Sequence, residues 1–556
     1  MLRLADRCDA AAVQDLDGLP EQARLRVWGM DLEVLGHAFD RRAGRALPKQ
    51  TRLPRRMLDA PPCVTRATSV ISARGKPGSS AAFAGGIMKE NMQKHWVLAM
   101  GLLLAFGAGL APSPARGAEG ALLWQQRLDA SAGFDTANST ATAGRRLFVA
   151  GAVTNAAGNS DWFVRALDAR SGAVLWQDQL DRAGRADSAQ AVVTERGLVF
   201  VSGYVTKAGN NRDLLVRVYE ANSGRLVWEN QFDRAGRRDE PDFFNLAVND
   251  GRVVVGGRSS NAAGVADWFV RAYDALSGVL LWQDLFDGGN FDHNLSLTIE
   301  SGRVYASGVT TDAGIVRHFT VRTYDAGTGA VLWQDQVQTG NPGFFFVTDV
   351  AWQIAARGRR VVAVGSIGDG SGRMKLAVRT YQAETGVLLW SDLLDSGGGS
   401  DVAFGVAVNE HGAFVAGSGG ASCSTSAASN CNWLVRAYDL DGGTLRWARE
   451  VDRSGGDDQP TAIVVADERV IVAGIGETGF ALGTFDWIVR AYSAKTGALV
   501  WENVVPSPAG EAHPLGMSVR GRRLFVNGWI VDGAGGGDWL VRAHDLKGRD
   551  RGDDDD

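Results

Sequence analysis

The sequence predicts an all-β protein built from one repeated unit, and three observations carry this prediction. The 556 residues include 71 glycines but only 14 prolines, a composition typical of many tight turns. Tryptophans recur at regular intervals from residue 124 onward. Between them, apolar and polar residues alternate with a period of two, the period of a β-strand. A repeat architecture also accounts for a length well above the about 100–200 residues of an ordinary domain.

The first part of the chain differs from the rest. Residues 1–87 carry 14 basic and 9 acidic residues and show no sustained period. A basic stretch from Met88, an uncharged run over 96–111 and small residues up to Ala118 follow. This order is the anatomy of a secretory signal peptide, and the run is shorter than the about 20 residues of a membrane span. We expect a signal peptide over 88–118. Residues 1–87 are then an extension from a mis-assigned start codon or, alternatively, a cytoplasmic segment before a signal anchor.

Export has consequences for charge and cysteine chemistry. From residue 119 onward there are 41 basic and 53 acidic residues, a net charge of −12, which argues against a nucleic-acid partner. We expect a periplasmic or secreted monomer without a transmembrane span in its mature part. In an oxidising compartment Cys423 and Cys431 predict a disulfide, whose short loop adds roughly 2.5 kcal/mol of stability. A redox or metal pair is the alternative.

The repeat is the most informative feature of the chain. Seven of its eight tryptophans close an eleven-residue phrase, Ala-x-Asp-x-x-x-Gly-x-x-x-Trp, first seen complete over 166–176. The last copy, from Ala543, stops before its tryptophan, and the first has only its end, up to Trp124. These two halves make one whole unit. The recurring tryptophans are Trp124, Trp176, Trp228, Trp282, Trp333, Trp390, Trp447 and Trp501.

Each unit of about 54 residues predicts four strands. Residues 188–193 represent the innermost strand, 146–151 the second, 162–166 the third, and the fourth begins at Val174 after a Ser-Gly hairpin. Such a unit cannot bury both faces alone, so neighbouring units must stack. We predict an eight-bladed β-propeller of four-stranded antiparallel blades over 119–548, followed by a charged tail over 549–556. The N-terminal strand around Trp124 pairs with the C-terminal strand and closes the ring.

The phrase resembles the tryptophan-docking motif of the quinoprotein-type (PQQ-like) eight-bladed β-propeller repeat family of bacterial exported proteins. The resemblance covers essentially all of 119–548. It implies that each tryptophan packs on the next blade near the motif's alanine. Quinoprotein dehydrogenases of this fold carry an adjacent Cys-Cys pair and hold the quinone and Ca²⁺ with a Glu, Asn and Asp set. This chain has no such cysteine pair, and the set cannot be placed in it. PQQ with calcium is therefore possible but unsupported, and no cofactor is expected.

Charged residues recur as regularly as the tryptophans. An aspartate follows the tryptophan by five residues in six units, for example Asp129, and a second follows six later at Asp135, Asp187, Asp239, Asp401 and Asp458. An arginine also recurs in the third strand of all eight units. We interpret these aspartates and arginines as links between blades, because arginine clamps carboxylates and aspartate caps turns. The alternative is an acidic ring that binds cations or a basic partner. The arginines of the third strand are Arg165, Arg217, Arg271, Arg322, Arg379, Arg436, Arg490 and Arg542.

Function is then expected where the repeat is irregular. Aromatic residues gather in the third to fifth units and predict a binding patch near the channel mouth. The alternative is that these side chains fill the core between blades. The loop between Cys423 and Cys431, an insertion between second and third strands, is a second candidate. The predicted patch consists of Phe243, Phe244, Phe291, His293, Phe344, Phe345 and Phe346.

The motifs argue more for binding than for catalysis. The histidines after residue 119 lack the H-E-x-x-H spacing, and the sequence has no C-x-x-C-H or G-x-S-x-G motif. The sequence therefore predicts an exported, non-catalytic binding or scaffolding module with a protein or surface ligand. Two alternatives are a PQQ-dependent dehydrogenase with a divergent site and an extracellular propeller that binds carbohydrate or another surface.

Overall fold

The computed structural model describes residues 118–131, 133–339, 349–420, 423, 430–453, 456–478, 484–507, 510–531 and 536–548, and two short strands near the N-terminus. The chain divides into two compact units, Met1–Trp96 and Val97–Asp556. In the first unit, β1 (Arg26–Val27) and β2 (Met30–Asp31) form an antiparallel pair. The predicted signal peptide, apart from Ala118, and the charged tail lie outside the described residues.

The second unit is made of antiparallel strands that pair in chain order. The first strands of the sheets are β4 (Thr136–Ala143), β8 (Ser188–Glu195), β12 (Asp239–Asn249), β16 (His293–Glu300), β20 (Val350–Arg357), β24 (Val402–Asn409), β28 (Asp458–Ala466) and β32 (Ala512–Arg520). The second strands are β5 (Arg146–Thr154), β9 (Leu198–Thr206), β13 (Arg252–Ser260), β17 (Arg303–Thr311), β21 (Arg360–Gly368), β25 (Gly412–Gly419), β29 (Arg469–Glu477) and β33 (Arg523–Val531).

The remaining strands complete the sheets. The third strands are β6 (Ser160–Asp168), β10 (Arg212–Glu220), β14 (Ala266–Asp274), β18 (Arg317–Asp325), β22 (Met374–Gln382), β26 (Asn432–Tyr438), β30 (Phe485–Ser493) and β34 (Gly537–Asp545). The fourth strands are β7 (Val174–Leu180), β11 (Leu226–Phe232), β15 (Leu280–Phe286), β19 (Val331–Val337), β23 (Leu388–Leu394), β27 (Leu445–Val451), β31 (Leu499–Val505) and β3 (Leu122–Leu128). A short 3₁₀ helix, η1 (Ala208–Asn210), lies between β9 and β10.

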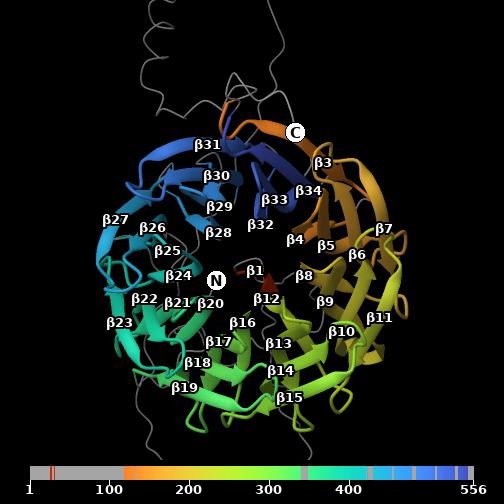
Figure 1. Cartoon of the computed structure of the whole chain (residues 1–556), viewed down its shortest axis with the longest axis horizontal. Coiled ribbons are helices and arrows are strands. Elements are labelled where there is room, and N and C mark those ends of the chain that lie inside the picture. Colours follow the sequence, from red (N-terminus) through yellow and green to blue (C-terminus); the bar gives the residue numbers. More distant parts are fainter. Residues whose placement is uncertain are drawn as a thin grey trace, which may run out of the picture. The chain divides into compact units, whose positions relative to one another are not determined.

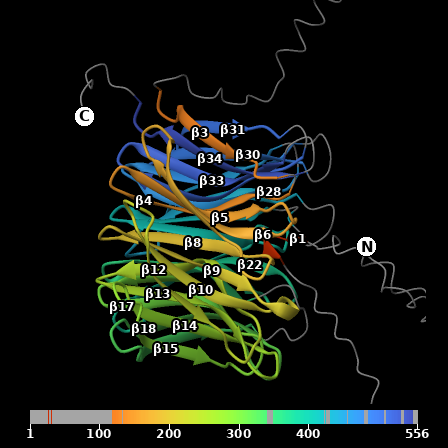
Figure 2. The ribbon, with the colours of Figure 1, turned by 90° about the vertical axis from the view of Figure 1, so that its right-hand side faces the viewer.

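The sheets of the second unit form a ring (Figure 1). Each first strand contacts the first strands of its neighbours, from β4 through β8, β12, β16, β20, β24 and β28 to β32, and β32 contacts β4 again. These strands surround the centre of the ring, and the fourth strands form its rim, as Figure 1 shows; Figure 2 shows the same ring from the side. A single bridge from Phe244 to Ser296 joins two neighbouring sheets into an eight-stranded sheet, β12–β19.

The ring is closed by the two ends of the repeat. Strand β3 pairs with β34, with Trp124 opposite Ala543, and completes the sheet of β32–β34. The prediction that the N- and C-terminal strands share one sheet is confirmed. This pairing gives the last sheet its fourth strand, and it links residues more than 400 positions apart in sequence.

Burial within a sheet follows the sequence pattern. The second and third strands, such as β5 and β6, are buried along nearly their whole length, because sheets pack against both of their faces. The fourth strands alternate between exposed and half-buried residues, as expected for the rim. Antiparallel pairing places two kinds of connection on opposite faces of the ring. We call the face with the second-to-third and fourth-to-first connections the loop face, and the other the hairpin face.

The recurring tryptophans join each sheet to the next. The indole of Trp228 lies against Gly278 in the hairpin of the following sheet, and its Nε1 donates a hydrogen bond of 3.0 Å to the carbonyl oxygen of Ala275. Trp501 lies in the same way against Gly120, at the N-terminal side of the ring. The pairs are Trp124–Gly172, Trp176–Gly224, Trp228–Gly278, Trp282–Gly329, Trp333–Gly386, Trp390–Gly443, Trp447–Gly497 and Trp501–Gly120.

Replacing one of these glycines tests how much the tryptophan contact stabilises the ring. A Cβ on Gly278 would lie 2.6 Å from the Trp228 ring, whereas one on Gly302, at nearly the same φ (+73° against +71°), meets nothing within 4 Å. We expect Gly302→Ala to cost only the about 1–2 kcal/mol of a left-handed alanine, and Gly278→Ala about 1–3 kcal/mol more, in urea unfolding. Equal losses of unfolding free energy for the two variants would show that the indole ring does not pack tightly against the glycine.

Candidate functional site

The recurring arginines bond the third strand of one sheet to the fourth strand of the sheet before it. The Asp178 carboxylate accepts hydrogen bonds from both Arg217 (2.5 Å) and Tyr219 (2.9 Å) of the next sheet. Arg542 reaches the equivalent Asn503 at 2.8 Å. Equivalent ion pairs join Arg322 to Asp284, Arg379 to Asp335 and Arg436 to Asp392.

The other three arginines bond within their own sheet, to Gln177, Gln283 and Glu502. Five of these arginines therefore link neighbouring sheets and three brace their own sheet, so all eight are engaged in bonds of the ring.

The second aspartate of each unit anchors the loop before it. Asp187 is fully buried and accepts hydrogen bonds from the backbone N–H groups of Arg182 (2.6 Å) and Thr206 (2.8 Å). The structure adds two members that the sequence spacing missed, Asp292 and Asp349, which accept equivalent backbone bonds. Burial raises the pKa of Asp187 from 3.8 to about 6 and outweighs the backbone bonds that lower it.

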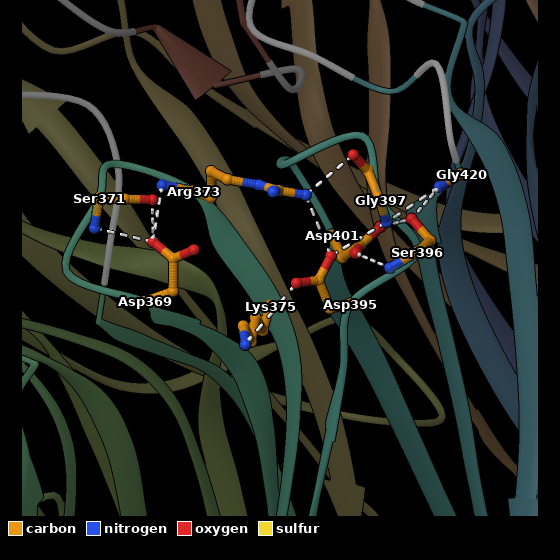
Figure 3. A network of polar contacts seen from close by, with 9 residues as sticks. All are labelled: Asp369, Ser371, Arg373, Lys375, Asp395, Ser396, Gly397, Asp401 and Gly420. Carbon is orange, nitrogen blue, oxygen red and sulfur yellow. Dashed lines mark hydrogen bonds and ion pairs between the residues drawn. The ribbon is translucent and has the colours of Figure 1, made fainter.

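Figure 3 shows this position before the sixth sheet, Asp401, together with polar residues of the fifth sheet. Asp401 accepts bonds from the backbone N–H groups of Ser396 (2.6 Å) and Gly420 (3.2 Å). Lys375 takes the third-strand position that Asp161 occupies in the first sheet, and its ammonium lies 3.6 Å from Asp395. A cation of the chain itself therefore enters the acidic loop here.

Lys207 also places its ammonium group among the acidic residues of a loop, at the second sheet. Its Nζ lies 2.6 Å from both Asp213 and Asp233, whose carboxylate oxygens gather with those of Asp239 within 4.8 Å of one another. These two lysines neutralise acidic loops from within, so the expectation of an acidic ring that binds cations or a basic partner stays a prediction.

The loop-face disulfide is present. Cys423 and Cys431 are bonded, and Cys423 is fully buried. The Cys431 carbonyl accepts a hydrogen bond of 2.6 Å from the backbone N–H of Asp458, the first residue of β28. The predicted disulfide is confirmed, and its loop is tied to the neighbouring sheet. Cys8 and Cys63 lie outside the described residues.

The predicted aromatic patch is only partly within the described residues. Phe344, Phe345 and Phe346 and the side chain of Phe243 lie outside them. Phe244 is 41% exposed. Phe291 is half-buried beside Leu295, Val309 and Val350, with its ring 6.0 Å from His293. Phe291 thus belongs to a small apolar cluster, and Phe244 is the member of the predicted patch that the structure places at a surface.

Phe244 is exposed because β12 carries an enlarged bulge. In β4 one residue, Asn138, lies outside the pairing with β5, whereas in β12 four residues over 242–245 face one residue of β13. The last bulge residue, Asn245, is fully buried and donates a hydrogen bond of 2.6 Å to the Asn294 carbonyl, and pairing with β13 resumes at Leu246. The bulge lifts Phe244 out of the sheet and leaves it beside Ser296 of the neighbouring first strand.

A buried ionic cluster, which sequence reasoning missed, lies at the loop-face end of the same strand. The Glu240 side chain is 7% exposed and accepts hydrogen bonds of 2.9 Å from Arg212 and from Arg258, with Arg238 at 3.7 Å. Burial alone would raise the pKa of Glu240, but the three guanidinium groups hold it well below its usual range. His293 lies 3.4 Å from Asp242, and burial lowers its pKa to about 3, so its imidazole is neutral at pH 7.

The first strands enclose a central cavity of about 330 Å³. Its wall comes from β4, β8, β12, β16, β20 and β24, and a second cavity of about 190 Å³ extends to β28 and β32. Phe244, Ser139 and Gln353 line both cavities. The walls consist of aliphatic side chains, serine and threonine hydroxyls, Gln353 and Asn138 amides, one methionine and the Phe244 ring.

A family model described as the outer membrane protein assembly factor BamB matches residues 160–316 and 317–513, more than half of the chain. The fold and this match define the class, and the chain belongs to the PQQ-like, BamB-type β-propeller repeat family. The comparison with curated proteins gives no match.

Solved structures with a similar fold include quinohemoprotein alcohol dehydrogenases from Pseudomonas putida HK5 (16% identity, 78% of this chain and 77% of that chain, TM-score 0.46) and Comamonas testosteroni (14%, 78% and 78%, 0.48). BamB from Moraxella catarrhalis is another (15%, 76% and 99%, 0.33). At these scores the likenesses carry no conclusion about activity.

Among the described residues, the walls of the two cavities hold no charged side chain for pyrroloquinoline quinone and Ca²⁺. Pyrroloquinoline quinone is a tricarboxylate and is held together with Ca²⁺, so its site needs charged and hard oxygen ligands. The cavity walls described above offer hydroxyl, amide and apolar groups instead. The nearby Glu240 is already held by three arginines.

The buried aspartates predict a pH dependence of stability. The pKa of Asp187 is about 6 in the folded protein, above its ordinary 3.8, so its favourable contribution is complete below about pH 4 and is lost as the pH rises through 6. We expect urea unfolding of Asp187→Asn to show a shallower fall in stability over this window than the parent protein. Asp250→Asn, at an exposed hairpin-face turn, is the control and should keep the parental slope. A parental slope in Asp187→Asn would contradict the assignment.

The ionic cluster predicts a large loss from one substitution. Glu240→Gln would leave three guanidinium groups around a neutral side chain, and we expect it to lower the free energy of unfolding by about 3–5 kcal/mol. The control is Glu410→Gln, which breaks an exposed pair with Arg357 and should cost less than about 1 kcal/mol. Similar losses of unfolding free energy for the two variants in urea would show that the ion pairs of Glu240 are no stronger than an exposed pair.

Proposed function

We propose that the protein is an exported, eight-bladed ring that binds a protein partner without catalysing a reaction. The eight-stranded sheet β12–β19 counts as two blades in this proposal. The observation that carries it is the irregularity of β12, where the enlarged bulge and the Glu240 cluster set one sector of the loop face apart from the repeated sheets. A single partner requires such a departure from symmetry, because identical sheets offer identical surfaces.

Two further observations support binding at the loop face. The repeated arginines and buried aspartates are engaged in bonds between and within sheets, so they serve the ring. The disulfide-tied loop of Cys423 and Cys431 also lies on the loop face. Membership of a family whose model is described as an outer membrane assembly factor favours a scaffold of the cell envelope.

Location is part of the proposal. The segment over 88–118 supports export to the periplasm or beyond, and the described part of the chain holds no helix with the length and apolarity of a transmembrane segment. A quinone-dependent dehydrogenase is the weaker proposal, since the uncharged channel wall suits neither the quinone carboxylates nor calcium.

Site-specific photocrosslinking tests which face binds. Ile315 is 55% exposed in the β17–β18 loop beside the irregular sector, and Leu276 is 73% exposed in a hairpin on the opposite face. With a photoreactive residue at each position in the exporting cell, we expect one discrete protein adduct from position 315 and none from 276. Equal labelling from both positions, or none from 315, would contradict a partner at the loop face.

A titration of the purified protein with pyrroloquinoline quinone, with and without Ca²⁺, tests the alternative. We expect no saturable change in the absorbance of the quinone. Saturable one-to-one binding would replace the scaffold proposal with a dehydrogenase, to be followed with alcohols and sugars in a dye-linked assay.

A further inference from the structure

The central cavity has a chemical character of its own, separate from the loop face. Its volume of about 330 Å³ lies at the lower end of the roughly 300–1,000 Å³ of ligand pockets. Nine of its fourteen lining residues are aliphatic, such as Val192, Leu246 and Ile354, and serine, threonine and glutamine side chains also line it. Among the described lining residues, the one aromatic ring is that of Phe244, which is 41% exposed. A ligand of this cavity must therefore be small and must offer both polar and apolar groups to the wall.

The polar groups of the wall act mainly as donors. The Ser139 hydroxyl oxygen accepts a hydrogen bond from the backbone N–H of Val192 (3.3 Å), and the Gln353 amide oxygen accepts one from Val406 (2.6 Å). The Ser296 hydroxyl oxygen likewise accepts from the backbone N–H of Ile354 at 3.4 Å. Since the oxygens are engaged with neighbouring strands, the two hydroxyl hydrogens and the amide NH₂ group remain for a ligand.

These donors are held in place. Each of the three bonds joins the first strand of one sheet to the backbone of the next first strand, so the donors are positioned by the ring itself. Phe244 lines the same cavity from the bulge of β12, beside Asn245, which is buried and bonded to the next sheet. A wall prepared in this way loses little conformational entropy when a ligand binds.

We propose that the central cavity binds a neutral carbohydrate of one or two sugar units, with a sugar face stacked on Phe244. A pyranose presents an apolar C–H face to an aromatic ring and, around its edge, hydroxyl and ring oxygens that accept hydrogen bonds. The donors of Ser139, Ser296 and Gln353 match these oxygens. The wall of hydroxyl, amide and apolar groups favours the uncharged sugar over a sugar acid or phosphate, which would lose its hydration without gaining a counter-charge.

Calorimetry with the full chain tests this site. The probes are glucose, N-acetylglucosamine, maltose and cellobiose, with glucose 6-phosphate as the charged counterpart of glucose. We expect saturable one-to-one binding of at least one neutral sugar, and at least tenfold weaker binding of the phosphate than of glucose. Phe244→Ala should weaken the binding of that neutral sugar at least tenfold, and Phe244→Tyr should retain it within about threefold, since tyrosine keeps the stacking face.

Leu281→Ala is the matched control, because this rim residue is 44% exposed, close to the 41% of Phe244. It should leave sugar binding unchanged. Circular dichroism and urea unfolding of each variant separate a lost site from a lost fold, and Phe244→Tyr keeps the test informative where Phe244→Ala unfolds. Absence of binding by all four neutral sugars, or binding that is indifferent to Phe244, would overturn the proposal. The photocrosslinking result at position 315 is independent of either outcome.

Discussion

The contact between each tryptophan and the glycine of the next hairpin is the constraint on which the ring depends. Indole and backbone meet so closely that no Cβ fits at Gly278, and the same geometry returns at every seam, including Trp501 against Gly120 across the two chain ends. A single contact of this kind fixes the distance and tilt between two sheets. Repeated around the ring, it leaves β3 in position to pair with β34 and to complete the last sheet.

The repeat also decides which residues are free for function. The aspartate–arginine–tyrosine bonds, such as those of Asp178 with Arg217 and Tyr219, and the buried loop anchors, such as Asp187, occupy the charged residues of the regular units. Lys207 even fills an acidic loop with a cation of the chain. A ring built this way is held by its regular residues and can vary only where a strand or loop departs from the pattern.

Most of the fold could be predicted from the repeat, and its irregular units can be found in the sequence because they change the spacing between tryptophans. The interval from Trp228 to Trp282 is two residues longer than the one before it, and those residues are the excess of the β12 bulge. Asp292 was missed because its loop is one residue shorter than in earlier units. The Glu240 cluster could not be predicted, since Arg212 comes from another sheet and only the folded ring brings it to Glu240. The aromatic patch stays a prediction: Phe244 is exposed and Phe291 is half-buried, a difference between channel wall and core that spacing alone could not predict.

One strand connects the two surfaces proposed for binding. The start of β12 holds the Glu240 cluster at the loop face, and its bulge places Phe244 in the channel a few residues later. The buried ion pairs resist displacement of this end, because separating Glu240 from its arginines would leave charges without counter-charges in a desolvated site. The position of Phe244 is therefore set from one side by the cluster and from the other by Asn245, whose amide is bonded to the next sheet. A ligand in the channel meets a wall whose geometry is set by the same residues that distinguish this sector of the loop face.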